Sequence, residues 1–393
     1  MSIRYCSKCV YPAVAATPLT FDDEGVCSGC RVSAQRDAID WNARRKMMRE
    51  LVDEYRSSSN YDIVIPVSGG KDSYWQTHVA IHEFGLKPLL VTYHGNNYFP
   101  EGESNLLRMR EVFDCDHIIV KPGVDTLIKM NLLGFKLQGD MNWHNHCGIF
   151  TSPIQVAVRY KVPLMLWGEH GFMDLGGMYS FNDFVEFTAK YRLEHAQRGF
   201  DWFDFTDEGL EKLGRPELKL GLSAKDLLWA QYPSDDEIAD VGVRGIYLSN
   251  FLRWEANHHS KLVVEKYGWE PARQPFERTY RTFSNLDDMH ENGVHDYLKF
   301  IKIGYGRGTD HSCKDIRAGL MTRAEGIETV RTYDHVKPRR DLARWLDYVS
   351  MSEEEFDAIC DGFRDPRVWT QENGLWMKDT IWGEKTAYGP VRI

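Results

Sequence analysis

The sequence lacks the features that would place the protein in a membrane or on a nucleic acid. Its 393 residues contain no apolar run long enough to cross a bilayer and no signal-peptide pattern, so we expect a cytoplasmic protein. The 48 lysines and arginines are outnumbered by 58 aspartates and glutamates, which gives a net charge of −10. Broad binding to a phosphate backbone needs clustered basic residues. We therefore predict no membrane and no nucleic-acid partner.

Cysteine is sparse after the first 30 residues, and no C-x2-C pair recurs there. Before that point two C-x2-C pairs are separated by residues 10–26, and they consist of Cys6, Cys9, Cys27 and Cys30. This spacing is typical of structural zinc sites, whereas a reducing compartment disfavours the alternative of two disulfides. We predict a four-cysteine zinc-ribbon module over residues 1–33. Four thiolates leave no open position on the metal, so its role is structural.

The G-x-x-x-x-G-K-[ST] loop of nucleotide hydrolases is also missing, but another glycine-rich loop is present. It follows an apolar strand pattern over residues 61–67 and precedes a helical pattern, and it consists of Ser68, Gly69, Gly70, Lys71, Asp72 and Ser73. Glycine lets the backbone approach a ligand, and the first helical N–H groups favour an anion such as phosphate. Asp72 is suited to hold Mg²⁺ on that phosphate. The alternative is an ordinary turn in which Asp72 or Ser73 caps a helix.

Apolar strand patterns alternate with helical ones over residues 61–67, 87–94, 117–120, 162–169 and 245–251. This alternation predicts an α/β fold with a doubly wound parallel sheet. Ligands of such sheets lie outside the carboxyl ends of the strands. That edge would bring the glycine-rich loop together with Tyr93 and His94 after the second strand and with Gly168 and Glu169 after the fourth. Each could be a simple turn, but their convergence favours an ATP site.

The same patterns divide the chain into four parts. A linking helix over residues 34–60 joins the zinc module to a nucleotide-binding domain over 61–255. The aromatic and acidic stretch at about 175–245 is weakly periodic, and we expect it to be an insertion that caps the active edge of the sheet. Residues 256–393 are mostly helical, with an aromatic tail at 369–382 suited to packing on a surface or partner.

Two further stretches carry candidate substrate residues. Residues 141–150 contain Asn142 and His146, which are suited either to line a substrate loop or to cap the entry of a helix. A metal site formed by His144, His146 and Cys147 is disfavoured because no fourth ligand lies at a sensible spacing.

The second stretch contains Arg307 and Asp310 between glycines, followed by Arg317. Arginine forks onto phosphate or carboxylate, so this stretch is a candidate anion-recognition element. The alternative is an ordinary helix-loop-helix in which Arg317 pairs with a carboxylate.

At S-G-G-K-D-S the chain resembles the PP-loop ATP pyrophosphatases, which have the adenine nucleotide alpha hydrolase-like fold. Together with the cysteine module, Trp167-Gly168-Glu169, the motif at 295–299 and the motifs at 304–310 and 315–317, it resembles the N-acetyl sugar amidotransferases. These act in bacterial surface-polysaccharide and nonulosonic acid biosynthesis, including lipopolysaccharide O-antigen. Where that family often has alanine, this chain has Gly308, which puts the rigidity of that loop in doubt.

The resemblance implies a reaction and roles. ATP adenylates the acetamido carbonyl of an activated sugar, and ammonia replaces its oxygen to give an acetamidino sugar, AMP and pyrophosphate. The catalytic candidates are Asp72, Lys71, Arg307 and Asp310. The residues expected to bind ATP are Ser68 to Ser73, Tyr93, His94, Gly168 and Glu169. Those expected to bind the sugar are Asn142, His146, Arg307, Asp310 and Arg317. The cofactors are structural Zn²⁺ and Mg²⁺.

The ammonia requires a source, and the chain shows no glutaminase motif. Cys147 lacks the glycine-flanked elbow of a class I glutaminase nucleophile. We therefore expect a separate glutaminase subunit, similar to that of the histidine pathway.

Two alternative functions remain. A PP-loop tRNA thiolase also has zinc knuckles before its phosphate loop, but it needs further catalytic cysteines. The other alternative is a zinc-ribbon scaffold protein with a degenerate nucleotide fold.

Overall fold

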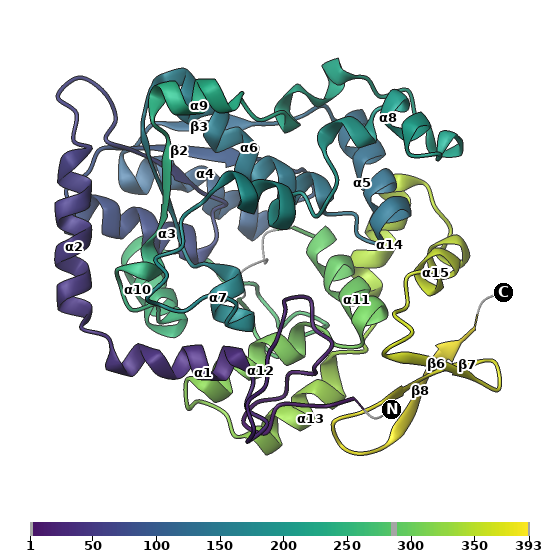
Figure 1. Ribbon diagram of the computed structural model, residues 1–393. Helices are drawn as coiled ribbons and strands as arrows, with labels where there is room; N and C mark the ends of the chain where they lie inside the picture. Colours follow the sequence, from purple (N-terminus) through teal and green to yellow (C-terminus); the bar gives the residue numbers. More distant parts are fainter. Residues whose placement is uncertain (1–2, 284–288, 392–393) are drawn as a thin grey trace.

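The computed structural model describes residues 3–283 and 289–391. Its centre is a five-stranded sheet in the order β3-β2-β1-β4-β5, and all four strand pairs are parallel (Figure 1). The strands are β1 (Ile63–Pro66), β2 (Pro88–Tyr93), β3 (His117–Val120), β4 (Leu164–Trp167) and β5 (Arg244–Tyr247). The doubly wound parallel sheet predicted from the sequence is confirmed. Each strand lies inside its predicted range, except that β5 begins one residue earlier.

Successive residues of a strand point to opposite faces, so each strand supplies both cores. Ile63 and Ile65 pack on one face, which is covered by α2 (Trp41–Glu54), α3 (Lys71–His78), α4 (Pro100–Phe113) and α10 (Ala256–Tyr267). Val64 packs on the other face, against α6 (Trp143–Tyr160) and α9 (Asp235–Val241), and α5 (Val124–Gln138) packs against α6. Burial on both faces explains why the strand sequences are continuously apolar.

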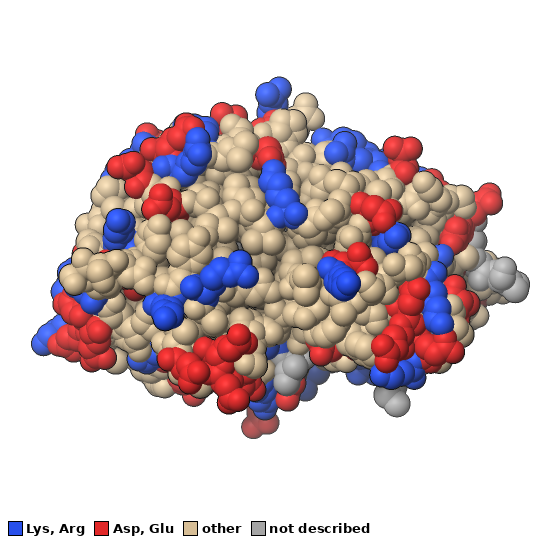
Figure 2. Space-filling model, turned by 90° about the horizontal axis from the view of Figure 1, so that it is seen from above, with Lys and Arg blue, Asp and Glu red and all other residues tan. Residues whose placement is uncertain are grey.

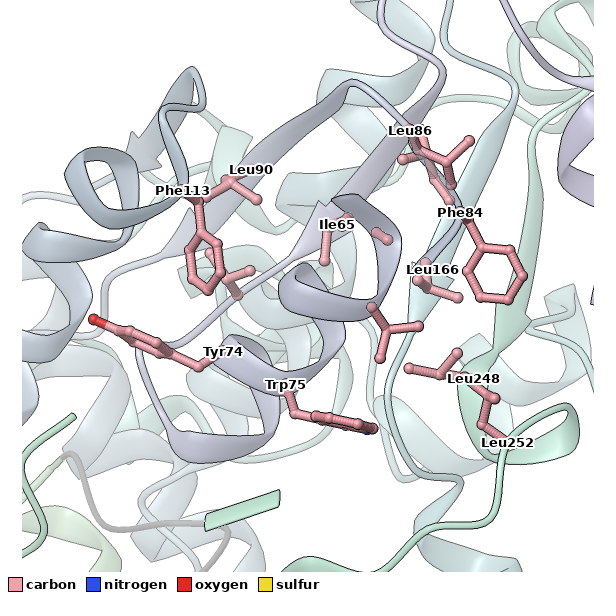
Figure 3. Close-up of a cluster of buried hydrophobic side chains, with 14 of the residues drawn as sticks. Ile65, Tyr74, Trp75, Phe84, Leu86, Leu90, Phe113, Leu166, Leu248 and Leu252 are labelled. Carbon is pink, nitrogen blue, oxygen red and sulfur yellow. The ribbon is translucent and has the colours of Figure 1, made fainter. Parts of the chain in front are cut away.

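The first of these cores fixes the helix that follows the glycine-rich loop. Figure 3 shows Tyr74 and Trp75 of α3 among Ile65, Leu90 and Phe113, with the Tyr74 and Phe113 ring centres 5.4 Å apart. Full burial of such a side chain contributes about 1.5–3 kcal/mol. The amino end of α3 is therefore held at a defined position beside the end of β1.

The predicted linking helix is broken in two. The module ends in α1 (Ser28–Gln35), a short 3-10 turn follows at Arg36–Ala38, and α2 begins at Trp41. Ile39 is extended, with φ −85° and ψ 133°. Asp40 then caps α2, because its carboxylate accepts hydrogen bonds from the backbone N–H groups of Asn42 and Ala43, both at 3.0 Å. An aspartate cap before an apolar helix is a signal for a new helix start.

Most of the predicted insertion packs away from the active edge of the sheet, which we expected it to cap. α7 (Gly171–Gly176) lies at its start, and it contains α8 (Asp207–Lys212), α9 and several short 3-10 and π turns. Its apolar residues Phe205, Leu210 and Leu227 are fully buried against α5 and α6. Residues 202–230 thus cover a helical layer rather than the active edge, because their hydrophobic side chains have that surface to bury against. Only the start of the insertion stays near the edge.

The C-terminal region is mostly helical, as predicted. Its helices after α10 are α11 (Glu291–Ile303), α12 (Arg307–Arg317), α13 (Arg323–Tyr333), α14 (Arg339–Val349) and α15 (Glu353–Asp361). In Figure 1, α12 and α13 lie beside the amino-terminal module. The hydrogen bond from Tyr11 to Asp310 and those from Arg323 to the carbonyls of Cys6 and Cys9 join the module to these two helices.

The aromatic tail is part of a small antiparallel sheet that the sequence analysis missed. Its strands are β6 (Trp369–Glu372), β7 (Leu375–Asp379) and β8 (Lys385–Pro390). Asn373 and Gly374 join the first two with positive φ values of 50° and 71°. Asn-Gly between two strands is a strong hairpin signal. Trp369 is buried and packs edge-on against Phe300 of α11, so the tail packs on this chain itself.

In the described part of the chain, every helix is too short or too polar to cross a membrane. Figure 2 shows the molecule from above. On that face basic and acidic side chains are interspersed around a broad uncharged area.

Candidate active site

The glycine-rich loop forms a tight connection between β1 and α3. Gly69 has a φ of +86°, and a Cβ at this position would lie 2.6 Å from the Cα of Leu106. Only glycine combines this conformation with so close an approach to another helix. Ser68 and Ser73 face each other across the loop, with the Ser68 N–H donating to Ser73 Oγ at 3.0 Å and the Gly70 N–H donating to Ser68 Oγ at 3.2 Å. The loop is therefore pre-formed around the amino end of α3.

The two charged residues of the loop form an ion pair. Lys71 is buried, and its Nζ lies 2.7 Å from Asp72 Oδ2. The other carboxylate oxygen, Asp72 Oδ1, is buried and has no hydrogen-bond partner among the described residues. A buried oxygen of this kind fits a cation ligand, so Asp72 is the residue that would hold Mg²⁺ here.

The end of β4 places a second acidic residue near this loop. Glu169 is paired with Lys314 of α12, with 3.2 Å between Glu169 Oε2 and Lys314 Nζ. Lys314 also contacts Asp174 Oδ2 at 2.5 Å. Burial, together with the negative charge of Asp174, raises the pKa of Glu169 to about 7. A carboxyl group with this pKa can accept and release a proton near neutral pH. Gly168, the preceding residue, packs close to Gln76 of α3.

Of the two predicted residues at the end of β2, His94 lies near the loops at this edge of the sheet, and Tyr93 points into the core. The ring of His94 is stacked on Tyr98, and its Nε2 lies 2.8 Å from Glu103 Oε2. The ring of Tyr93, in contrast, points into the core beneath α6, where its hydroxyl lies 3.0 Å from His144 Nδ1. Tyr93 can therefore shape the site through its backbone, whereas its side chain is occupied in the core.

Two cavities lie beside these loops. The first, of about 420 Å³, is lined by Gly69 and Gly70 and by the aromatic rings of Phe99, Trp269 and Phe276; we call it the aromatic cavity. The second, of about 400 Å³, is lined mainly by charged side chains and by Trp254; we call it the charged cavity. Its charged residues include Arg36, Glu169, Asp174, Arg281, Lys314 and Arg317. The edge of the sheet where these loops lie is called the nucleotide edge, because an ATP site is predicted there. The two cavities beside it share no lining residue.

The four cysteines of the amino-terminal module converge, and their sulfur atoms lie within 4.8 Å of one another. The Sγ atoms of Cys9 and Cys27 are 3.7 Å apart, close to the edge of about 3.8 Å that a tetrahedron with 2.3 Å Zn–S bonds requires. Cys6 Sγ accepts hydrogen bonds from the backbone N–H groups of Lys8, Cys9 and Cys27, at 3.3–3.4 Å. The donor set fits zinc, and all four positions would come from the protein.

The comparisons with known proteins identify one region. The family model "LPS biosynthesis protein WbpG-like, C-terminal domain" matches residues 277–381. We call residues 277–381 the WbpG-like domain. This match supports the family predicted from the sequence.

A similar solved structure is the NH3-dependent NAD synthetase from Campylobacter jejuni subsp. jejuni NCTC 11168 in complex with the nitrate ion. It has a TM-score of 0.28 and 15% identity, and the match covers 60% of this chain and 100% of that one. No curated protein matches the chain.

Within the WbpG-like domain, Arg307 and Asp310 are engaged in ion pairs. Arg307 forks onto Asp296 of α11, with its Nη2 2.6 Å from Asp296 Oδ1. Asp310 accepts a hydrogen bond from Tyr11 at 2.7 Å and pairs with Lys299. Asp310 is buried and Arg307 is partly buried, and neither lines the aromatic or the charged cavity. Their predicted roles in substrate binding stay predictions.

Arg317 and Gly308 complete this helix. Arg317 lines the charged cavity and donates to the backbone carbonyls of Asp174 and Leu175, at 2.7 and 3.1 Å, rather than to a carboxylate. Its Nη2 also lies 3.7 Å from Cys27 Sγ. Gly308 lies in the first turn of α12, where a Cβ would be 2.7 Å from Asp334 Oδ1. The motif at 304–310 is therefore a helix start, not a flexible loop.

Residues 141–150 contain the entry of α6, as the second of the two sequence interpretations had it, but the Asn142 side chain at its N-cap makes no capping hydrogen bond. Asn142 bonds to Asn292 of α11 at 3.1 Å and accepts from Asn145 at 2.9 Å. His146 contacts Arg198 at 3.0 Å. Neither residue lines the two cavities beside the glycine-rich loop.

The sequence analysis missed Lys314 and the three aromatic residues of the first cavity. A signal for Lys314 exists, because Arg307, Asp310, Lys314 and Arg317 have the 3-4-3 spacing of one helical face. That signal becomes visible only when residues 307–317 are recognised as a helix. For Trp269 no local signal exists, since its Nε1 reaches Gly69 O, at 2.9 Å, from 200 residues away.

The zinc module provides a direct test. We expect the wild-type protein to contain about one zinc ion per chain and Cys27→Ser to lose it, because three thiolates bind more weakly and binding is coupled to folding. Elemental analysis measures the metal, and thermal unfolding measures the expected fall in Tm. The control is Cys115→Ser, whose half-buried thiol lies outside the cluster. Wild-type protein without zinc would contradict the assignment.

Proposed function

We propose that this chain is an ATP-dependent amidotransferase of bacterial surface-polysaccharide biosynthesis, in which it converts the acetamido group of an activated N-acetyl sugar into an acetamidino group. The observation that supports it most is the glycine-rich loop at the switch point of the sheet. In the order β3-β2-β1-β4-β5, β1 and β4 diverge from neighbouring positions. Ligands of doubly wound sheets bind at such a point, and here the loop after β1 lies near Glu169, which follows β4. The WbpG-like domain, named for lipopolysaccharide biosynthesis, supplies Lys314.

The proposed reaction has two steps, adenylation of the amide oxygen and displacement of AMP by ammonia. The amide oxygen attacks the α-phosphorus of ATP and pyrophosphate leaves, which makes the amide carbon electrophilic. Ammonia then adds to that carbon, loses a proton, and AMP departs with the former amide oxygen. No nucleophile from the protein is needed. The backbone N–H groups at the start of α3 stabilise the departing pyrophosphate, and Lys71 adds positive charge.

Two groups complete the catalytic roles. When bound, Mg²⁺ supplies positive charge to the phosphates, and Asp72 is the residue of this chain that fits it. Glu169 is suited to take the proton that the attacking ammonia loses, because its pKa of about 7 lets it act as a base near neutral pH.

The two cavities suggest how the substrates divide. The aromatic cavity has three rings, Phe99, Trp269 and Phe276, and touches the loop backbone directly, which suits the flat base of ATP. The charged cavity combines carboxylates and guanidinium groups with Trp254. Sugar hydroxyls both donate and accept hydrogen bonds, and so they match this mixed lining. We assign the activated sugar to the charged cavity.

The nitrogen source belongs to a partner in this proposal. Cys147 is buried, its Sγ faces the carbonyl of Ala230 at 3.5 Å, and burial raises the pKa of its thiol far above the usual range. Such a thiol is a poor nucleophile. A glutaminase subunit is therefore proposed to deliver ammonia.

The alternative of a tRNA thiolase receives no support from the cysteines. Within residues 3–283 and 289–391, the zinc module is the one group of three or more clustered cysteines. The net charge of −10 also disfavours a tRNA substrate.

The reaction itself is the first prediction of this proposal. With ATP, Mg²⁺, ammonium and a panel of nucleotide-activated N-acetyl sugars, mass spectrometry should find one product about 1 Da lighter than its sugar, as exchange of carbonyl O for NH requires. Asp72→Asn should reduce pyrophosphate release by about 100-fold or more, since it removes charge from the phosphate site. Asp53→Asn on the exposed surface of α2 is the control. Near-normal turnover by Asp72→Asn would exclude this site.

The partner is tested through the nitrogen donor. The isolated chain should form AMP with high ammonium but not with glutamine, and glutamine should serve only after the glutaminase is added. The measurement is AMP formation under the four combinations. If the isolated chain uses glutamine as well as the pair does, the partner proposal fails and Cys147 becomes the first residue to study.

The division of substrates is tested by filling each cavity separately. Leu320→Trp, at an exposed position lining the charged cavity, should raise the KM for the sugar about tenfold and leave the KM for ATP unchanged. Gln274→Trp, lining the aromatic cavity, should do the reverse. Each variant is the control of the other. The opposite pattern would exchange the two assignments.

A further inference from the structure

A group of side chains away from the cavities brings two histidines and a carboxylate together. Asp140 lies in the turn between α5 and α6, His146 in the first turns of α6, and His295 on α11 of the WbpG-like domain. One ligand atom of each lies within 4.8 Å of the others. We propose that Asp140, His146 and His295 form a second metal site, which binds a divalent transition-metal ion and is distinct from the zinc module.

The donor set defines the class of metal. Two imidazoles and one carboxylate suit Zn²⁺, Co²⁺, Ni²⁺ or Fe²⁺, whereas Mg²⁺ and Ca²⁺ prefer oxygen ligands alone. Three protein ligands leave at least one position for water. Ligand atoms of one such ion lie about 3.0–3.5 Å apart when the bonds are about 2.1 Å, so a small rotation of the side chains closes the site.

The carboxylate is already oriented by its neighbours. Asp140 is almost fully buried, and its Oδ1 accepts the backbone N–H of Asn142 at 3.0 Å and lies 2.8 Å from His295 Nδ1. The backbone N–H orients the carboxylate as outer partners do at metal sites, and the ion would replace the proton that lies between Asp140 Oδ1 and His295 Nδ1. The same residue therefore links the entry of α6 to α11 before any ion is bound.

The position between the ligands already attracts positive charge. Arg198 places Nη1 2.5 Å from Asp140 Oδ2 and Nη2 3.0 Å from His146 Nε2. Because a guanidinium only donates, His146 Nε2 presents its lone pair to this cation. The carboxylate oxygen and the imidazole nitrogen thus converge on one point, as they would around a metal ion.

Arg198 can leave that position. Its side chain is 39% exposed, and its backbone has a φ of +54°, a left-handed conformation that is costly for arginine. Lys302 is the other cation near Asp140, but its Nζ points to the carbonyl of Gln138, 3.4 Å away. His144 is no competing ligand, because it is bonded to Tyr93 and Asn131. A metal ion would therefore displace Arg198 alone.

The site would join two parts of the chain. Asp140 and His146 belong to the nucleotide-binding fold, and His295 to the WbpG-like domain. An ion that binds only the folded arrangement stabilises it by mass action. The expected effect of the metal is therefore a higher Tm, independent of the substrate and of the reaction proposed above.

Cobalt separates this site from the zinc module. Zinc-loaded protein is titrated with Co²⁺, and binding is followed by calorimetry and by visible absorption. The new site should bind about one Co²⁺ per chain and give weak d–d bands without the intense thiolate charge-transfer bands of a cysteine site. Zinc content is measured afterwards, and exchange of Co²⁺ into the module without further binding would overturn the proposal.

Substitutions make the test specific. His295→Ala and, independently, His146→Ala should abolish this binding, while His335→Ala, which lies outside the cluster, should not change it. Arg198→Gly should tighten it at least about tenfold, because it removes the competing cation and relieves the left-handed backbone. An ion-pair cluster with no metal function predicts no Co²⁺ binding by any variant. Binding by Arg198→Gly alone, with none by the wild type, would also overturn the proposal, and circular dichroism confirms that each variant is folded.

Discussion

The charged face of α12 is the interaction on which the other parts of the structure depend. Arg307 and Asp310 pair with Asp296 and Lys299 of α11, Lys314 pairs with Glu169 and Asp174 beside β4, and Arg317 reaches Cys27 of the zinc module. These groups are largely buried, and removing one partner of a buried pair costs about 3–5 kcal/mol. One helix therefore fixes the relative positions of the module, the nucleotide edge and the WbpG-like domain.

This arrangement gives the zinc module a role beyond its own fold. Tyr11, which lies between the two cysteine pairs, is buried and donates to Asp310, and Arg323 of α13 donates to the carbonyls of Cys6 and Cys9. Zinc bound by the four cysteines would order the segment that carries these contacts. It would thereby help to position Lys314, which lies on the helix that this segment contacts.

The nucleotide edge shows how the fold limits where chemistry can occur. The order of the strands brings the loop of β1 beside the loop of β4, and Tyr74 and Trp75 hold α3 in the core beneath the first loop. The buried oxygen of Asp72 and the protonatable Glu169 then lie at the same edge. The WbpG-like domain adds side chains to both cavities, Arg281 and Lys314 to one and Arg340 to the other. Residues outside the sheet thus line both cavities.

The sequence alone determined the features that depend on local spacing. Apolar runs determined the five parallel strands, two C-x2-C pairs determined the four clustered cysteines, and the glycines at 69 and 70 determined the turn between β1 and α3. Asn373-Gly374 also determined a hairpin, although the aromatic residues around it were interpreted as a tail. Each of these is encoded within about 25 residues.

Only the tertiary structure decided which charged and polar groups meet. Glu169 finds Lys314, Gly69 finds Trp269, and Asp140 finds His295, each across more than 140 residues. The sequence predicted Arg307 and Asp310 as substrate residues, and only the fold shows that they pair with Asp296 and Lys299 of α11. The reason is physical: a charged side chain has no periodic signature, and its partner is chosen by the packing of apolar surfaces elsewhere in the chain.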